Sequence, residues 1–79
     1  MNIKVLGPGC TNCQRLEDTV EKAVEQLGIE ADVSKVTDYA EFMTYGIMST
    51  PALVVDEEVK IAGRVPSLDE VVAVLQSAG

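Results

Sequence analysis

The 79-residue sequence contains no histidine and no tryptophan, and it has only two cysteines, two tyrosines and one phenylalanine. Without histidine, the chain cannot form the Cys–His or Ser–His pairs that activate many catalytic nucleophiles. Two cysteines supply only half of the ligands of a closed Cys/His zinc site. The sequence also lacks an apolar run of the roughly 18 residues that a transmembrane helix needs. These absences argue against histidine-dependent catalysis, a structural zinc site and a membrane span.

Basic residues are scarce as well, so the chain is strongly acidic. Six lysines and arginines stand against 13 aspartates and glutamates, which gives a formal net charge of −7. A field of this sign opposes nucleic-acid phosphates and anionic membrane surfaces. We therefore expect neither nucleic acid nor a membrane as a partner. The opening stretch MNIKVLGPGC has one lysine and a very short apolar run, which does not match a secretory signal peptide, so we expect a cytoplasmic protein.

Apolar residues make up 47% of the chain, which is enough to build a hydrophobic core at this length. The sequence shows no repeat, low-complexity tract or linker, so we expect residues 1–79 to form a single domain that acts as a monomer. The apolar periodicity predicts strands at residues 2–6, 30–36, 51–56 and 59–62, and helices at residues 11–27, at 38–46 and from Ser67 onward.

The predicted order of elements is β-α-β-α-β-β-α. A strand–helix–strand start requires the first two strands to be parallel, whereas the last two strands form a hairpin with no glycine to mark its turn. The charges of residues 30–36 indicate an edge strand. Together these features predict an α/β fold, in which a mixed four-stranded sheet is flanked by three helices.

Both cysteines lie in the stretch GPGCTNC, where the first predicted strand ends and the first helix begins. The free N–H groups and the positive dipole at a helix start favour a thiolate at Cys10 and lower its pKa. Cys13 begins the apolar stripe of the helix and should lie deeper. An offset of three residues brings the two Cα atoms to roughly 5–6 Å, within disulfide range. We predict that Cys10 is the nucleophile and Cys13 the resolving thiol of dithiol–disulfide exchange.

The neighbours of the cysteines fit this interpretation. Gly9 leaves space beside Cys10 for the sulfur of a substrate; the alternative is that this glycine only permits the turn. Thr11 and Asn12 are small and uncharged, so the helix dipole remains the main influence on the pKa of Cys10. Further along the same helix, three glutamates recur at every fourth position, Glu17, Glu21 and Glu25. Such a row is normally just a solvated helix face; the functional hypothesis is that it selects basic partner proteins.

Two segments, CTNC (10–13) and YGIMSTPAL (45–53), resemble the thioredoxin/glutaredoxin superfamily, and most closely its small archaeal and bacterial thioredoxin-like, redox-active disulfide proteins. The resemblance covers nearly the whole chain and implies a thioredoxin-like fold. It also implies a cis peptide bond between Thr50 and Pro51, with Pro51 against the disulfide. The backbone of Thr50 would then face outward and pair with an extended substrate segment. In the same way, Gly63 is implied to border the substrate groove.

The sequence departs from the family pattern at several positions. Thr11 and Asn12 replace the dipeptides typical between the cysteines, and Gly9 stands where thioredoxins have tryptophan. Lys4 stands six positions before Cys10, where thioredoxins carry a buried acidic residue. The tail AGRVPS (62–67) matches the glutathione-binding pattern of glutaredoxins only in part.

The resemblance implies a thiol–disulfide oxidoreductase that acts on disulfide-containing protein substrates, is recycled by a reductase and needs no cofactor. A heavy-metal-binding domain is the alternative, because it also places Cys-x-x-Cys between a first strand and a first helix, and two thiolates suffice for linear Cu(I). Against it, Pro8 replaces the methionine of that motif, and the chain is predicted to end in a helix. A third interpretation is an interaction domain of this fold without turnover.

Overall fold

The computed structural model describes residues 1–78, and the elements in this range follow the predicted order. The strands are β1 (Asn2–Leu6), β2 (Asp32–Val36), β3 (Ala52–Val55) and β4 (Glu58–Ala62), and the helices are α1 (Thr11–Leu27), α2 (Tyr39–Thr44) and α3 (Leu68–Ala78). The bounds of β1 and α1 match the prediction, whereas β2 begins two residues later than predicted. No helix within residues 1–78 is long and apolar enough to cross a membrane.

The four strands form one mixed sheet in the order β2-β1-β3-β4. β1 pairs with β2 in parallel and with β3 in antiparallel, and β3 and β4 form an antiparallel hairpin. β2 therefore lies at an edge, as its charges predicted. The thioredoxin-like α/β fold is confirmed: a four-stranded mixed sheet with three helices.

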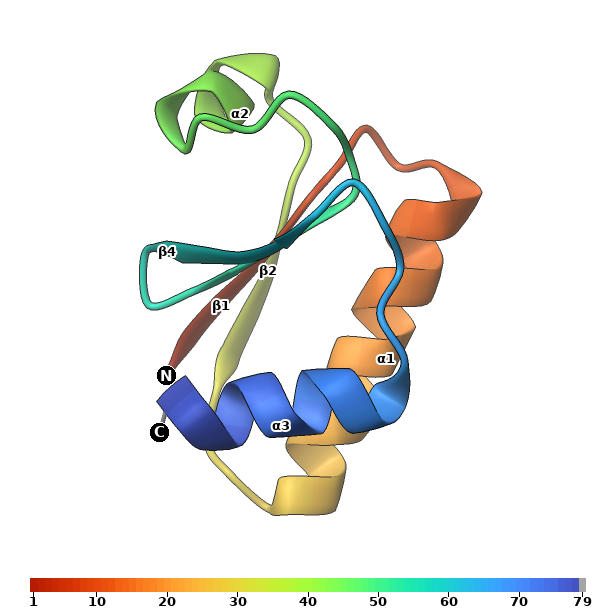
Figure 1. The fold of residues 1–79 in the computed structure, drawn as a ribbon, viewed down its shortest axis with the longest axis vertical. Helices are drawn as coiled ribbons and strands as arrows, with labels where there is room; N and C mark the ends of the chain where they lie inside the picture. The colour runs from red at the N-terminus through yellow and green to blue at the C-terminus, as the bar shows by residue number, and fades with distance from the viewer. Residues whose placement is uncertain (79) are drawn as a thin grey trace.

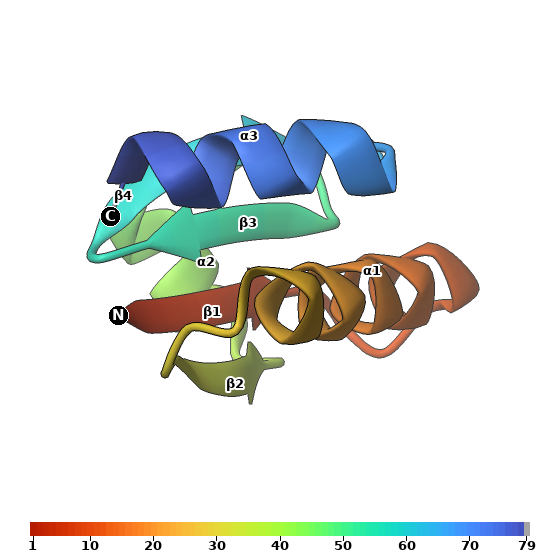
Figure 2. The ribbon, with the colours of Figure 1, turned by 90° about the horizontal axis from the view of Figure 1, so that it is seen from below.

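The helices cover the two faces of the sheet unequally. α1 and α3 lie side by side over one face, and the short helix α2 lies on the other (Figures 1 and 2). The larger core cluster joins β1, β3 and β4 to α1 and α3, and its buried members are Ile3, Val5, Leu16, Val20, Ala23, Leu53, Val55, Ile61, Val71 and Leu75. The smaller cluster lies under α2 and consists of Leu6, Phe42, Ile47, Ala52 and Val54. β3 contributes to both clusters because successive side chains of a strand point to opposite faces.

Helix α1 is defined by its two ends and by its apolar stripe. Cys10 is its N-cap residue, and Gly28 ends it in the left-handed conformation at φ 64°, which glycine adopts without steric cost. The buried positions are Cys13, Leu16, Val20 and Ala23, while Val24 and Leu27 pack partly buried against the core. The apolar stripe that Cys13 was predicted to begin therefore faces the core, and Ala23 belongs to it as well.

The hairpin between β3 and β4 turns through two residues, Asp56 and Glu57. Val55 pairs with Glu58 across the turn, and both turn residues have positive φ, 48° and 71°. Positive φ at both central positions is the type I′ geometry, which normally favours Asn-Gly or Asp-Gly. The sequence did not specify the turn type. The structure shows a type I′ turn in which both central residues carry side chains.

Candidate redox site

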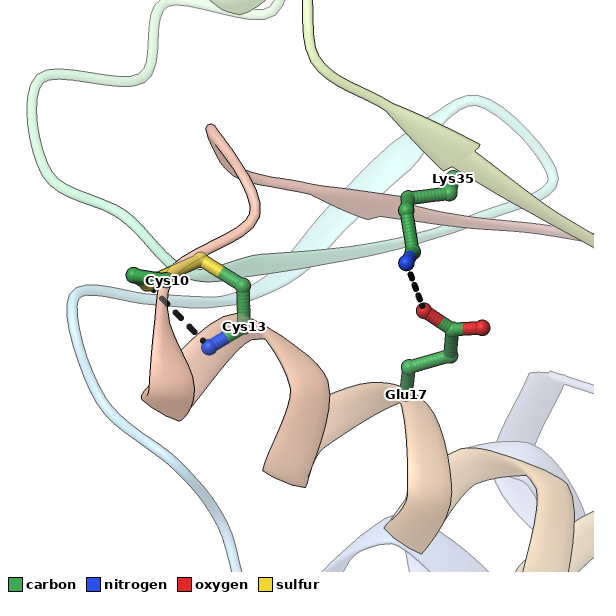
Figure 3. Close-up of a disulfide and its surroundings, with 4 residues drawn as sticks. All are labelled: Cys10, Cys13, Glu17 and Lys35. Carbon is green, nitrogen blue, oxygen red and sulfur yellow. Dashed lines mark hydrogen bonds and ion pairs between the residues drawn. A yellow bond between two sulfur atoms is a disulfide. The ribbon is translucent and has the colours of Figure 1, made fainter.

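The two cysteines lie at the N-terminus of α1, directly after the loop that follows β1. They are joined by a disulfide, with their Cα atoms 5.0 Å apart (Figure 3), within the range predicted from their spacing. Cys10 has extended backbone as the N-cap residue, and Cys13 is in the first helical turn. The sequence folds this way because the turn Gly7–Gly9 ends the strand and leaves Cys10 where the helix begins.

The exposure of the two sulfur-bearing residues differs as predicted. Cys10 is exposed, whereas Cys13 is only 3% exposed. The Cys13 backbone N–H donates a hydrogen bond to Cys10 Sγ at 3.2 Å, so one of the free amides of the helix start already points at this sulfur. The first turn of α1 contains no acidic residue, and the positive helix dipole is therefore not offset there. This environment favours a thiolate at Cys10 once the disulfide is reduced.

Pro51 follows a cis peptide bond from Thr50, and the cis geometry implied by the family resemblance is confirmed. Pro51 is buried and Thr50 is half-buried. Both Pro51 and Cys13 abut Gly7: a Cβ built on Gly7 would overlap Cys13 Sγ and would lie 3.9 Å from Pro51 Cα. Pro51 and the Cys13 sulfur therefore both lie close to Gly7 and near each other.

Gly7 is a residue that the sequence analysis missed, because it appeared only as one member of a turn. It is buried, and its N–H donates to Val36 O at 2.9 Å, which extends the pairing of β1 with β2. A side chain at this position would occupy the space of the Cys13 sulfur. Its position in the sequence was the signal that could have identified it. A glycine directly after a buried strand, three residues before the first cysteine, indicates that other atoms approach the backbone closely there.

The other two predicted glycines occupy different surroundings. Gly63 lies against the segment before Pro51: its N–H donates to Pro51 O at 2.8 Å, and a Cβ on it would come within 3.1 Å of Ser49 Cβ. Gly9 is exposed, and a Cβ on it would meet nothing within 4 Å. The structure therefore brings Gly63 to the site and leaves open space at Gly9, while their roles in substrate binding stay predictions.

Lys4 does not take the place of a buried acid but belongs to a polar group on the α2 side of the sheet. Lys4 Nζ donates to Tyr45 Oη at 2.7 Å and to Glu57 Oε1 at 3.1 Å, and Tyr45 Oη donates to Glu57 Oε2 at 2.6 Å. The hydrogen bond with Tyr45, followed by that with Glu57, raises the pKa of Lys4. The Tyr45 hydroxyl and then the Lys4 ammonium lower the pKa of the Glu57 carboxyl. Sequence reasoning identified none of these contacts.

The predicted acidic row on α1 is interrupted at its first member. Glu17 Oε2 forms an ion pair with Lys35 Nζ on β2 at 3.0 Å (Figure 3), whereas Glu21 and Glu25 are exposed. The freely presented part of the row is therefore Glu21 and Glu25. Within residues 1–78, no group of three or more histidine, cysteine or acidic side chains is placed to hold a metal ion.

Comparison with known proteins identifies the family. A family model described as a thioredoxin domain matches residues 1–76, and the chain belongs to this thioredoxin family. A thioredoxin from Methanothermobacter thermautotrophicus is 41% identical over 75 residues, which cover 95% of this chain and 97% of that protein. A thioredoxin from Methanocaldococcus jannaschii is 37% identical over 75 residues, covering 95% of this chain and 86% of that protein. The resemblance inferred from the two motifs is thus confirmed. Family membership and the Cys10–Cys13 disulfide together support a thiol–disulfide oxidoreductase in the general sense.

Proposed function

We propose that this protein is a dithiol reductase of protein disulfides, in which Cys10 attacks and Cys13 resolves. The observation that carries the proposal is the unequal exposure of two disulfide-bonded cysteines at one helix N-terminus, with the residue Cys10 exposed and the residue Cys13 buried. An intermolecular reaction needs a reachable first sulfur, while a sheltered second sulfur reacts only within the protein.

The reaction proceeds in two exchange steps that balance in electrons and protons. The Cys10 thiolate attacks one sulfur of the substrate disulfide, which forms a mixed disulfide and releases the other substrate sulfur as a thiolate that takes up a proton. Cys13 then loses its proton to solvent and attacks Cys10 Sγ. This step releases the second substrate thiol and leaves the Cys10–Cys13 disulfide, so two electrons pass from the protein to the substrate.

The segment around Pro51 supplies the substrate-binding surface in this proposal. The outward backbone of Thr50 pairs with an extended segment of the substrate, as an added strand pairs with a sheet edge. Gly63 borders the same surface, since its N–H contacts Pro51. Gly9 keeps the approach to Cys10 free of side chains.

The proposed cycle needs a partner that returns the protein to its dithiol form. Thioredoxins in general act on disulfide substrates and are recycled by a reductase, and we propose the same for this chain, as a cytoplasmic monomer that requires no bound cofactor. Its support is the family match over residues 1–76 and the two-cysteine exchange chemistry, which passes electrons through sulfur alone.

Trapping the mixed disulfide tests the assignment of the two cysteines. In Cys13→Ser, the resolving step is lost, so incubation with a disulfide protein should yield a stable covalent adduct through Cys10, visible by mass. The matched variant Cys10→Ser should yield no adduct, because Cys13 is buried. An adduct that forms only through Cys13 would reverse the proposed roles.

The Cu(I)-binding alternative is distinguished by a redox titration followed by mass, carried out with and without Cu(I). The order of elements supports exchange, since helix α3 follows the β3–β4 hairpin, where the metal-binding fold has a strand. A reversible change between dithiol and disulfide at a cytosol-like potential supports the reductase. Tight, stoichiometric retention of Cu(I) would instead support the metal carrier.

A further inference from the structure

A second group of polar side chains lies on the α2 face of the sheet and has no part in the exchange steps. We propose that Lys4, Tyr45 and Glu57, here called the positioning network, hold the segment that leads to Pro51 in the shape that an extended peptide substrate requires. The inference rests on the proposed function, because it assigns positioning residues to the same substrate-binding surface.

The positioning network connects three parts of the chain that are distant in sequence. Lys4 is in the middle of β1, Tyr45 is the C-cap residue of α2, and Glu57 is in the turn between β3 and β4. Each member makes hydrogen bonds to the two others, so the loss of one side chain breaks two contacts. Lys4 Nζ also lies 5.3 Å from the centroid of the Tyr45 ring, within the range of a cation–π contact.

Tyr45 begins the segment that carries the proposed substrate-binding backbone. Between Tyr45 and Pro51, only Ile47 is buried, whereas Met48 is 99% exposed. At the far end, the Gly63 N–H holds the Pro51 carbonyl at 2.8 Å. Near the Tyr45 end, the Ile47 N–H donates to Phe42 O at 2.9 Å. The segment is thus secured mainly near its two ends, and in this proposal the position of Tyr45 sets where the chain runs on toward Thr50. Pairing with an extended peptide depends on the position of that backbone.

The backbone of Glu57 gives independent support for a role of its side chain. Its φ of 71° lies in the left-handed region, which is disfavoured for residues with a Cβ and is usually occupied by glycine in such a turn. Glycine would remove the strain, but it would also remove the carboxylate that accepts from Lys4 and Tyr45. Strain of this kind persists where surrounding contacts hold it, often at functional sites.

Two disulfide substrates distinguish an effect on the positioning of the substrate backbone from an effect on the exchange reaction itself. A short linear peptide that carries a mixed disulfide needs both the cysteines and the Thr50 backbone. Bis(2-hydroxyethyl) disulfide has no peptide backbone and needs only Cys10 and Cys13. A defect in the positioning network should therefore slow exchange with the peptide and leave exchange with the small disulfide unchanged.

The test compares reduced wild-type protein with Tyr45→Phe and Glu57→Gly in single-turnover reactions. Tyr45→Phe keeps the ring and removes only the hydroxyl, and Glu57→Gly relieves the turn while it removes the carboxylate. For the peptide, each variant should lower the second-order rate constant at least about fivefold, because each breaks two hydrogen bonds and the loss of one ordinary hydrogen bond corresponds to roughly that factor. The double variant should lose no more than either single variant, because both substitutions break the same network.

Glu58→Gln is the matched control, because it removes a carboxylate from the same hairpin that pairs with Lys60 instead of Tyr45. It should leave both rates unchanged. Thermal unfolding is measured in parallel, and Glu57→Gly should melt close to wild type because the relieved turn offsets the lost contacts.

The inference is overturned if the peptide rate is unchanged in Tyr45→Phe and Glu57→Gly, or if both substrates slow in parallel with a loss of stability. If wild-type protein reduces neither disulfide, the proposed function fails and this inference fails with it. Normal reduction by wild type with no difference between the substrates in the variants overturns the inference alone.

Discussion

The two faces of the sheet are packed by different means, and the redox site draws on both. The α1/α3 face buries a large, purely apolar cluster between two long helices, whereas the α2 face has a six-residue helix, a smaller cluster and the hydrogen-bonded side chains of Lys4, Tyr45 and Glu57. The first face carries the cysteines at the start of α1. The second face contains Tyr45, from which the chain continues to Thr50 and Pro51.

This difference suggests a division of tasks between the two faces. The reacting sulfurs need fixed geometry, and a densely packed helix supplies it. The proposed substrate-binding segment from Tyr45 to Pro51 is instead held mainly near its two ends, by the hydrogen bonds of Tyr45 and of the Pro51 carbonyl, so its position depends on few contacts. We therefore expect the two faces, which differ in packing, to contribute differently to the free energy of unfolding.

Truncation of the two adjacent valines of β3 should show the largest difference. Val54 and Val55 are equally buried, but Val54 points into the α2 cluster and Val55 into the α1/α3 cluster. Truncation of a buried valine to alanine removes two methyl groups and costs roughly 1.5–3 kcal/mol when the cavity that they leave is included. We expect Val55→Ala to cost the upper part of this range and Val54→Ala the lower part, because the smaller cluster can relax around the cavity. Urea unfolding measures both values, and equal losses would contradict the proposed difference between the faces.

Substitution of Gly7 should lower the stability of the region in which Cys13 lies near Pro51. In Gly7→Ala, the new methyl group would overlap Cys13 Sγ, and overpacking of this kind costs roughly 1–3 kcal/mol. The oxidised form should be destabilised more than the reduced form, because a free Cys13 sulfur can rotate away. Unfolding of both redox forms by urea checks this expectation. Gly9→Ala is the control: its Cβ meets nothing within 4 Å, so its backbone cost should be equal in the two forms.

The sequence predicted the α1/α3 side of the molecule well, because the signals there are local. The 3.6-residue periodicity and Gly28 fixed the helix at residues 11–27, and the cysteine spacing fixed the proximity of the two sulfurs. The unequal exposure of Cys10 and Cys13 followed from their places at the cap and on the apolar stripe.

The sequence did not predict the contacts that depend on tertiary structure. Lys4, Tyr45 and Glu57 are separated by 41, 12 and 53 positions along the chain in their three pairs, and no local pattern links them. Gly7 was read only as a turn residue because its importance lies in its distance from a sulfur atom. The β3–β4 turn was left open because its left-handed positions carry Asp56 and Glu57 instead of glycine.

Acid should weaken the polar contacts of the α2 face before it affects the apolar cluster. The pKa of Glu57 is lowered from the ordinary 4.5, first by the hydrogen bond from Tyr45 and then by that from Lys4. A lowered folded-state pKa contributes stability that is present above the ordinary value and is lost as pH falls through the folded value. Thermal midpoints measured from neutral pH to below this value should therefore fall less steeply in Glu57→Gln than in wild type.

The carboxyl of Glu70 provides a comparison for this acid effect on the α3 side. Arg64 holds both of its oxygens, and the hydrogen bond with Arg64 lowers the pKa of Glu70. In Glu70→Gln, as in Glu57→Gln, the thermal midpoint should fall less steeply with acid than in wild type. Both effects should be small because the groups are exposed to solvent. Identical pH profiles in wild type and both variants would show that neither contact contributes.

Salt should have the smallest effect, and it tests the acidic surface of α1. Glu17 is engaged with Lys35, so Glu21 and Glu25 remain to attract a basic substrate protein. Raising the ionic strength from about 0.01 M to about 1 M shortens the Debye length from about 30 Å to about 3 Å, and exchange with a basic disulfide protein should slow as a result. The Glu21→Gln/Glu25→Gln double variant should be slower at low salt, by at most about fivefold, the value of one exposed ion pair. Glu17→Gln is the control and should behave as wild type, whereas salt-independent rates in wild type would exclude a steering role for the row.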